Sequence, residues 1–426
     1  MKQVREGYKM SEIGEIPSEW NVVKLKEVLD LLKDGTHNPP KRTETGIPLL
    51  SAENIFNGKI NYGLNEKCIS LDDYGLMHKN YEIEKGDILM TIVGTIGRVA
   101  IVKDNEKFTV QRSVAILKNN KKINNEFLAQ FLSSDICKKE LDKKSNSTAQ
   151  AGLYLGELAK INIILPTLKE QEKIASVLST VDEQIDNVDT LIEKNKELKK
   201  GLMQQLLTKG IGHTKFKKTE VGEIPEGWEV RKIGDICDVR GGKRLPKGYQ
   251  LEDENNGFPY IRVADMYMGG VKLSEIKYVP EEVVEKIKNY KISKDDLFIS
   301  VAGTLGIVGK VPEELDGANL TENADKLCNI KIDKLYLMKV LQSELVQSII
   351  DSEKTTNAQP KLALTRIKEF LIPVPNNEEQ KKIAVILSEF DDEIEEYQNK
   401  KEKLEELKKG LMQKLLTGKI RVCKGD

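Results

Sequence analysis

The chain has 426 residues, of which 39% are hydrophobic and 32% are charged, and its formal net charge is −1. This length predicts two domains, and the balanced charge excludes binding of a polyanion through bulk charge, so such binding needs local Lys and Arg clusters. Five scattered cysteines indicate a reduced, cytoplasmic protein without disulfides or a zinc knuckle. No run of about 18 apolar residues occurs, so we expect no membrane span and no membrane partner.

The chain opens with a segment that occurs twice. EIGEIPSEW (Glu12–Trp20) recurs as EVGEIPEGW (Glu220–Trp228), with an offset of 208 residues and the only two tryptophans of the chain in equivalent positions. An internal repeat of this length predicts two copies of one structural unit.

Basic, glycine-rich loops follow in both copies, namely DGTHNPPKRTETG (Asp34–Gly46) and RGGKRLPKGY (Arg240–Tyr249). Their Lys and Arg side chains can neutralise phosphates, and a rigidly held Arg can contact guanine in a major groove. Candidate nucleic-acid-binding residues in these loops are Thr36, Lys41, Arg42, Lys243, Arg244 and Lys247. An ordinary solvated loop is the alternative interpretation.

The sequence Asn38-Pro39-Pro40-Lys41 in the first loop resembles the Asn-Pro-Pro-aromatic motif of adenine methyltransferases. In that motif an aromatic ring stacks on the extruded base, which Lys41 cannot do. No glycine-rich cofactor loop accompanies the sequence, so we interpret it as a surface loop.

Short apolar runs broken by Gly, Asn and Pro predict strands in the remainder of each copy. IPLLSAENI, GDILMTIVGTIGRVAIV and INIILP in the first copy are matched in order by FPYIRVADM, DDLFISVAGTLGIVGKV and FLIPVP in the second. Helices are predicted at Asn125–Lys139, Pro280–Asn289 and Lys334–Asp351. Each copy is therefore predicted to contain an α+β domain with a curved mixed sheet.

Two glycine pairs lie 209 residues apart within these runs, in VGTIG (Val93–Gly97) and AGTLG (Ala302–Gly306). They lack the G-x-G-x-x-G spacing of a dinucleotide-binding loop. We expect them to form tight turns between strands.

Further polar side chains in the divergent parts suit the reading of base edges, although the same residue types are common on surfaces. These candidates are Arg98, Gln111 and Arg112 in the first copy and Arg262, Asn323 and Lys361 in the second.

A long helix is predicted between Thr167 and Leu207, where apolar residues recur mostly at three- and four-residue steps. Its stripe consists of Ile174, Leu178, Val181, Ile185, Val188, Leu191, Leu198, Leu202 and Leu206. Thr167 and Glu170 form a predicted capping box, and Gly210 follows the far end. At 1.5 Å per residue the helix is roughly 60 Å long, which exceeds what packing on one domain requires.

The second copy contains the matching helix, with Asn376 and Glu379 as its capping box and Gly418 beyond its end. EQEKIASVLSTVDEQI recurs as EQKKIAVILSEFDDEI, and ELKKGLMQ recurs unchanged, both at an offset of 209 residues. Its stripe consists of Ile383, Leu387, Phe390, Ile394, Tyr397, Leu404, Leu407, Leu411 and Leu415.

The two helices are predicted to form an antiparallel coiled coil, which places one globular domain at each end of a pseudo-two-fold symmetric rod. The alternative is that each helix packs on its own domain. Expected boundaries are 1–165 for the first domain, 166–210 for the first helix, 211–374 for the second domain, 375–420 for the second helix and 421–426 for a tail.

No catalytic constellation is apparent. His37, His78 and His213 are scattered along the chain, which supports neither a metal site nor histidine acid–base catalysis. A G-x-x-x-x-G-K-[ST] loop for ATP is absent from the sequence. We therefore predict no catalytic residue, no metal and no cofactor bound by this chain.

The ordered set of blocks resembles a known family. LPTLKEQEKIASVLSTVDEQI with KKGLMQQLLTKGI, and VPNNEEQKKIAVILSEFDDEI with KKGLMQKLLTGKI, are similar to the helical repeat regions of type I restriction–modification specificity subunits. GEIPSEW and GEIPEGW are similar to the starts of that family's two target-recognition domains. The resemblance covers essentially the whole chain.

This resemblance implies a non-catalytic subunit that binds double-stranded DNA, with each recognition domain reading one half of a split, asymmetric site. The helices are then expected to set the unread spacer and to dock two methylation subunits, which use S-adenosylmethionine. A separate restriction subunit uses ATP and Mg²⁺. The base-contacting residues do not carry over individually, because recognition domains vary most within the family.

Two other functions remain open at this point. A stand-alone DNA methyltransferase requires S-adenosylmethionine binding, against which the missing cofactor loop argues. A structural coiled-coil adaptor between two protein-binding domains is favoured by the balanced charge.

Overall fold

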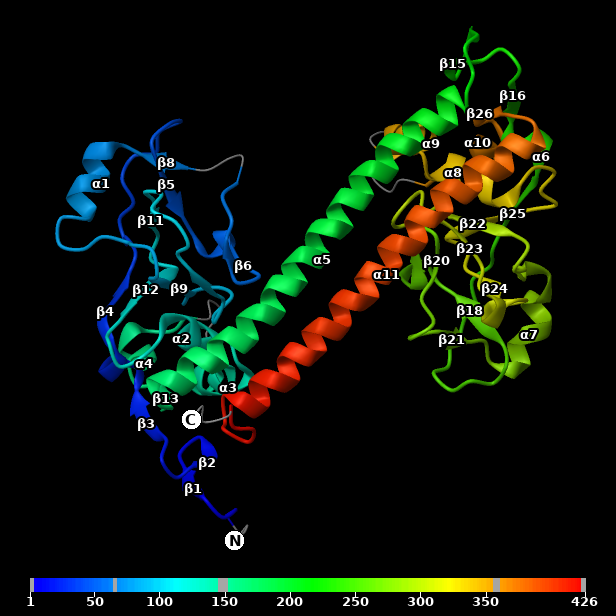
Figure 1. The fold of residues 1–426 in the computed structure, drawn as a ribbon. Helices are drawn as coiled ribbons and strands as arrows, with labels where there is room; N and C mark the ends of the chain where they lie inside the picture. The colour runs from blue at the N-terminus through cyan, green and yellow to red at the C-terminus, as the bar shows by residue number, and fades with distance from the viewer. Residues whose placement is uncertain (1–3, 64–66, 145–151, 355–360, 423–426) are drawn as a thin grey trace. The chain divides into compact units, whose positions relative to one another are not determined.

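The computed structural model describes residues 4–63, 67–144, 152–354 and 361–422. The chain divides into two compact units: unit 1 comprises Met1–Asp189 with Asn399–Asp426, and unit 2 comprises Thr190–Gln398. Each unit therefore contains one α+β domain, as predicted, together with parts of both long helices (Figure 1). None of the helices in the described ranges is long and apolar enough to cross a membrane.

Unit 1 begins with a small hairpin and continues through mixed strands and helices. Its elements are β1 (Tyr8–Ser11), β2 (Gly14–Pro17), β3 (Asn21–Lys24), η1 (Leu25–Val28), β4 (Leu29–Asp34), β5 (Ile47–Leu50), η2 (Ala52–Asn54), β6 (Ile55–Phe56), β7 (Lys59–Ile60), β8 (Cys68–Ile69), α1 (Leu71–Met77), β9 (Ile88–Thr91), β10 (Val99–Ile101), β11 (Thr109–Val110), β12 (Val114–Asn119), α2 (Asn125–Leu132), α3 (Asp135–Lys144), α4 (Leu155–Leu158), β13 (Asn162–Leu165) and the start of α5 (Leu168–Lys209).

Unit 2 repeats this order. Its elements are β14 (Phe216–Thr219), β15 (Gly222–Pro225), β16 (Glu229–Lys232), α6 (Ile233–Ile236), β17 (Asp238–Gly241), β18 (Pro259–Ile261), η3 (Val263–Asp265), β19 (Met266–Tyr267), β20 (Gly270–Val271), β21 (Lys277–Tyr278), α7 (Glu281–Ile287), η4 (Lys288–Tyr290), β22 (Leu297–Ser300), β23 (Val308–Lys310), η5 (Glu313–Leu315), β24 (Asn319–Leu320), β25 (Ala324–Cys328), α8 (Lys334–Gln342), α9 (Glu344–Lys354), α10 (Leu364–Lys368), β26 (Leu371–Val374) and the start of α11 (Asn377–Leu415). Only η4 and η5 have no counterpart among the described elements of unit 1.

The main sheet of each domain has four antiparallel strands, in the order β10-β9-β12-β4 in unit 1 and β17-β25-β22-β23 in unit 2. A three-stranded mixed sheet lies in each domain as well, because β11 runs parallel to β5 and β24 runs parallel to β18. Alternation along β12 sends Ala115 and Leu117 to the core that contains α2, and Val114 and Ile116 to a second core.

Two of the predicted helices are interrupted. The range predicted at 125–139 forms α2 and α3, because Ser134 begins a new helix by accepting a hydrogen bond from Cys137 N through its hydroxyl at 3.3 Å. The range predicted at 334–351 is divided at Ser343 into α8 and α9. Short polar residues compete for backbone hydrogen bonds in this way, which periodicity does not reveal.

The long helices pair in an antiparallel direction. In unit 1, Lys401 on α11 contacts Asp189 on α5 at 2.7 Å, and Lys408 contacts Asp182 at 2.6 Å. Residue numbers thus rise along one helix while they fall along the other, and the predicted pairing direction is confirmed (Figure 1).

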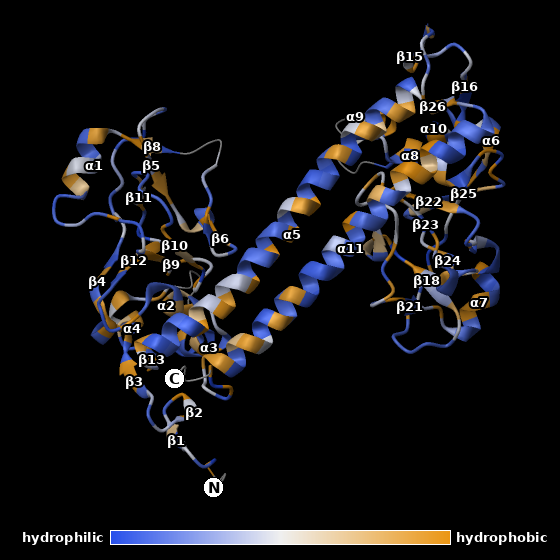
Figure 2. Ribbon diagram, viewed as in Figure 1, coloured by the Kyte–Doolittle hydropathy of each residue, from blue (hydrophilic) through white to orange (hydrophobic). Residues whose placement is uncertain are grey.

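Packing of the helices differs from a simple coiled-coil seam. Near its start, α5 buries Ile174 and Leu178 in the core of unit 1, where Leu415 from the end of α11 joins them. Leu198 and Leu407, which were predicted in the seam, are 54% and 51% exposed. Figure 2 accordingly shows separate apolar patches on two largely polar helices. The helices pack on the domains at their ends and leave equivalent leucines uncovered.

In each unit a buried tryptophan contacts the start of a long helix. Trp20 donates a hydrogen bond from Nε1 to Glu170 Oε2 at 3.0 Å, and Trp228 donates one to Glu379 Oε2 at the same distance. Both indoles are 1% exposed. The predicted N-caps form, because Glu170 N donates to Thr167 Oγ1 at 3.4 Å and Glu379 N donates to Asn376 Oδ1 at 3.0 Å. The sequence did not reveal that both glutamate carboxylates also bind a tryptophan about 150 residues away in sequence.

Each glutamate also contacts a second side chain, which comes from the segment that follows the opposite helix. His213, just after α5, contacts Glu379 at 2.8 Å, and Arg421, just after α11, donates to Glu170 at 3.0 Å. The end of one long helix is thereby tied to the start of the other within each unit.

Candidate nucleic-acid interface

One end of the four-stranded sheet in unit 1 gathers several candidate residues. The end of β4, the start of β12, the end of β9 and the start of β10 all lie there, because Ala115 pairs with Asp34 and Val114 pairs with Thr91. We call this end, with Thr36, Arg98, Gln111 and Arg112 as its polar residues, edge 1.

Backbone contacts hold edge 1 together. Thr36 forms a bridge with Gln111, and Arg112 N donates to Thr36 O at 3.0 Å. Arg98 N donates to Thr91 Oγ1 at 3.0 Å, at the end of the tight turn predicted around Gly94 and Gly97. The side chains of Arg98 and Arg112 are exposed.

The equivalent end of the sheet in unit 2 is edge 2, with Lys243, Asn323 and Lys361 as its polar residues. Lys243 N donates to Leu320 O at 2.8 Å, and Asn323 O accepts from Val301 N at 2.7 Å. Lys361 forms a bridge with Ala302. All three side chains are exposed, so edge 2 presents two cations and one amide to the surface.

A glycine makes each edge possible. A Cβ on Gly35 would lie 2.0 Å from Val110 O, and a Cβ on Gly242 would lie 2.1 Å from Thr321 O. No other residue fits at these distances unless the backbone moves. The two glycines therefore let the chain just after β4 and just after β17 pass close to the backbone at Val110 and at Thr321, respectively.

The remaining candidates lie in the loops that continue from the two edges or have partners inside the domain. Lys41 and Arg42 are exposed in the loop before the bridge between Thr43 and Cys68, and Arg244 and Lys247 are exposed in the loop after β17. Arg262 donates to both oxygens of Asp265 and also to Glu275 O, at 2.8 Å for the latter. Its guanidinium is thus occupied in joining η3 to the segment before β21.

Each edge also holds one aspartate that sequence reasoning missed. Asp34 on β4 faces Ala115 on β12, whereas in unit 2 the order is reversed and Gly241 on β17 faces Asp325 on β25. An aspartate thus belongs to the same cross-strand pair in both units, but it lies on the earlier strand in unit 1 and on the later strand in unit 2. Only the strand register reveals this correspondence.

The two aspartates have different surroundings. Asp34 contacts His37 Nε2 at 2.6 Å. Asp325 is 5% exposed, and its Oδ2 has no hydrogen-bond partner. Burial raises the pKa of Asp325 to about 6, against a smaller opposing effect of Lys361.

Replacing Asp325 by Ala, the residue at the equivalent position 115, is expected to stabilise unit 2 by about 2–3 kcal/mol at about pH 8. A raised pKa means that the folded state holds the proton more tightly, so the destabilising charge is absent below about pH 4 and fully present above about pH 6. Urea denaturation at about pH 4 and about pH 8 measures this difference. A gain of equal size at both pH values would contradict the assignment.

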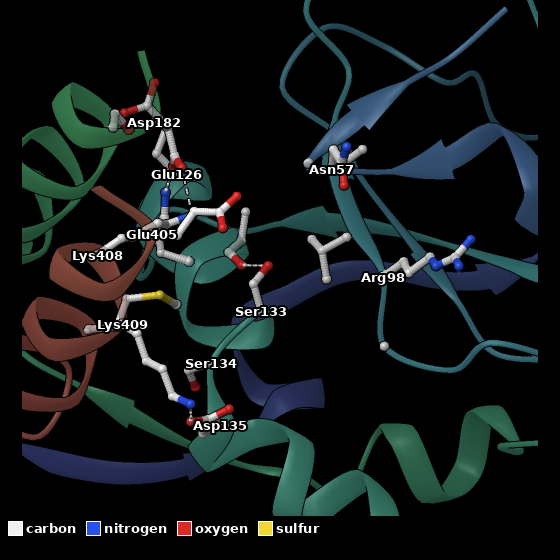
Figure 3. Close-up of a pocket in the computed structure, with 18 of the residues that line it drawn as sticks. Asn57, Arg98, Glu126, Ser133, Ser134, Asp135, Asp182, Glu405, Lys408 and Lys409 are labelled. Carbon is white, nitrogen blue, oxygen red and sulfur yellow. Dashed lines mark hydrogen bonds and ion pairs between the residues drawn. The ribbon is translucent and has the colours of Figure 1, made fainter. Parts of the chain in front are cut away.

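A groove of about 920 Å³ lies in unit 1 beside these elements, between α2, α3, the β6–β7 hairpin and the two long helices. Figure 3 shows Asp182 and Lys408 from the two helices on one side of the groove, with Asn57 and Arg98 across from them. Acidic and basic side chains line it together. Among the described residues no group of three or more His, Cys, Asp or Glu side chains is arranged to hold a metal ion.

A family model, the type I restriction modification DNA specificity domain, matches the chain twice, at residues 17–199 and 225–406. The two matches cover most of the chain and follow the internal repeat. This protein belongs to the type I restriction–modification DNA specificity family.

Curated relatives within the family match over nearly their whole length. The putative type I restriction enzyme MjaX specificity subunit of Methanocaldococcus jannaschii is 32% identical over 98% of this chain and 97% of its own. The MjaVIII specificity subunit of the same organism is 28% identical over 96% and 94%, respectively.

Solved structures share the fold of this family member. The S subunit of a type I restriction–modification system from M. genitalium aligns with a TM-score of 0.58 and 20% identity, over 93% of this chain and 96% of that one. A chain from a study of complex assembly and conformational transition of the type I system aligns with a TM-score of 0.53 and 19% identity, over 95% and 99%.

Proposed function

We propose that this chain is the non-catalytic DNA specificity subunit of a type I restriction–modification complex, in which each edge reads one half of a bipartite, asymmetric site. The main support is that the two edges have the same backbone hydrogen bonds but carry different side chains. Gly35 N donates to Val114 O, and Gly242 N donates to Ala324 O in the same way.

On this frame the side chains diverge position by position. Thr36 in edge 1 corresponds to Lys243 in edge 2, and Arg112 corresponds to Glu322. Base edges are distinguished by their pattern of donors and acceptors, so two such sets suit two different half-sites. Phosphate contacts by Lys41, Arg42, Arg244 and Lys247 then position the duplex without specifying its sequence.

The chemistry of the complex belongs to partner subunits in this proposal. Methylation subunits supply S-adenosylmethionine chemistry, and a restriction subunit uses ATP and Mg²⁺. Relatives named specificity subunits support the specificity role of this chain in such a complex. In this proposal the present chain binds the recognition sequence, and the partner subunits bind the base that reacts.

Two equivalent surface patches on the long helices suit the docking of two methylation subunits. Leu198 and Leu407 occupy the same position in the repeated ELKKGLMQ segment and are about half exposed. Gly201 and Gly410 follow three residues later, and nothing lies within 4 Å of a Cβ built on either one. A glycine inside a helix costs about 1 kcal/mol relative to alanine, and neither neighbourhood within this chain requires one.

Leu198→Lys and Leu407→Lys are each expected to remove one methylation subunit from the co-purified complex, and the double variant both, because a charge disrupts an apolar contact. Native mass spectrometry of the complexes measures the stoichiometry. Leu76→Lys is the matched control, since Leu76 on α1 is 76% exposed and lies outside the patches. Retention of two methylation subunits by the double variant would exclude this docking surface.

The proposed function is tested by co-expressing the chain with its methylation subunit and mapping modified bases in the host genome. A split motif with an unread spacer of fixed length supports the proposal. A contiguous motif, or methyl transfer by the isolated chain with S-adenosylmethionine, contradicts it.

A further inference from the structure

Each recognition domain is joined to both long helices by a three-residue polar cluster. In unit 1, Gln130 on α2 donates from Nε2 to Asp182 Oδ2 on α5 at 2.6 Å, and Lys408 on α11 contacts Asp182 Oδ1 at 2.6 Å. We call Gln130, Asp182 and Lys408 clamp 1. It lies along the groove shown in Figure 3, where Asp182 and Lys408 project from different helices.

Unit 2 contains the same cluster with one substitution. Lys339 on α8 and Lys199 on α5 both contact Asp391 on α11. These residues, clamp 2, stand 209 positions from their counterparts in the repeat, because 130 corresponds to 339, 182 to 391 and 408 to 199. In each unit the aspartate comes from the helix that follows the domain, and one lysine, Lys408 or Lys199, comes from the other helix.

The clamps differ in strength. Lys339 is 1% exposed, and burial lowers the pKa of its ammonium while Asp391 opposes that shift. A buried charge that loses its partner is strongly destabilising, so clamp 2 resists opening. Clamp 1 uses a neutral amide whose Oε1 is buried without a partner, and an amide can be separated from Asp182 at lower cost.

We propose that the two clamps are positioning devices, which fix the angle of each recognition domain on the helix pair and thereby the spacer length that the complex accepts. This inference rests on the proposed reading of a bipartite site. Both long helices continue from one unit into the other, so a domain that tilts on its helices moves its edge relative to the DNA. Half-site sequence depends on the edges, whereas spacer tolerance depends on the clamps.

Some other contacts between domain and helix differ between the two units. Lys59 on the β6–β7 hairpin contacts Asp186 on α5 at 2.6 Å. The corresponding residues in unit 2 are Gly270 and Glu395, which cannot form this ion pair. The clamp, by contrast, joins the domain to both long helices in both units, as the Trp–Glu contacts at the starts of these helices also recur. This correspondence between domains that have otherwise diverged favours a common positioning role over local stabilisation.

The test uses the co-expressed complex and duplexes that contain both half-sites with spacers of native length, one base pair longer or one base pair shorter. Lys339→Met combined with Asp391→Leu removes clamp 2 without leaving a buried charge. Its discrimination against the altered spacers is expected to fall roughly 3- to 30-fold, with the half-site sequences unchanged. Lys339→Gln restores the chemistry of clamp 1 and is expected to retain most of the discrimination.

Lys401→Met with Asp189→Leu is the control, because this ion pair joins the two long helices without a recognition domain. If it relaxed spacer selection as much as the clamp variant, the positioning role would be excluded. Should the clamp 2 variant fail to fold, Gln130→Leu with Asp182→Leu tests the same point in unit 1. A folded clamp variant with the spacer discrimination of the wild type would overturn the proposal. Failure of the wild type to select any split site would instead overturn the proposed function.

Discussion

Replacing Trp228 by Ala is expected to destabilise unit 2 by about 3–5 kcal/mol, because it removes a large buried ring and its hydrogen bond to Glu379. Gly210 packs against this ring so closely that a Cβ there would lie 2.7 Å from Trp228 Cζ2. The loss therefore also loosens the junction between the end of α5 and the start of α11.

Hydrogen–deuterium exchange resolves the effect by unit. We expect faster exchange in β16, β26 and the start of α11, with little change in the domain of unit 1. Trp228→Phe keeps most of the packing and loses the indole donor, so its cost is about 1–2 kcal/mol. Trp20→Ala is the matched variant and should show the reverse distribution. Equal loosening of both domains by either variant would show that the two junctions are not independent.

Gly242→Val is expected to abolish recognition of one half-site while leaving the other intact. The added Cβ would collide with Thr321 O and Leu320 O, at 2.1 Å and 2.4 Å, and both atoms belong to backbone. The segment that carries Lys243 must then move away from Asn323. We expect about a 100-fold loss in binding to the cognate half-site, comparable to one or two mismatched base pairs.

Gly241→Ala provides a neighbouring control, because its Cβ would lie 3.5 Å from Asp325 Oδ1, an ordinary contact. Gly35→Val should have the corresponding effect on the other half-site. Competition binding with duplexes altered in one half-site at a time distinguishes the two variants. If Gly242→Val weakened binding to all duplexes equally, edge 2 would not be a sequence-reading surface.

Much of the fold could be predicted from local sequence. The steps of three and four residues along α5 and α11 and the glycine pairs at Gly94 and Gly303 report local geometry directly, and both features were found where expected. Periodicity alone did not show which apolar residues are covered. Leu198 and Leu407 fit the stripe but remain exposed, because burial depends on what packs against a helix.

The composition of the edges could not be predicted, since neighbouring strands are distant in sequence. β4 pairs with β12 some 80 residues later, so neither the Asp34–Ala115 pair nor its reversal in unit 2 is visible without the register. The contacts of Trp20 and Trp228 with glutamates at the starts of the long helices could not be predicted either, because the partners are distant in sequence. Residue type alone also selected Arg262, whose guanidinium binds Asp265 within the domain.

If the two domains read separate half-sites, modification mapping with paired variants separates their contributions. Strains would carry the methylation subunit with the wild-type chain, with Arg98→Ala and Arg112→Ala in edge 1, or with Lys243→Ala and Asn323→Ala in edge 2. We expect one split motif for the wild type and relaxation of a different single half by each double variant. Equal loss of both halves in either variant, or a contiguous motif in the wild type, would contradict it.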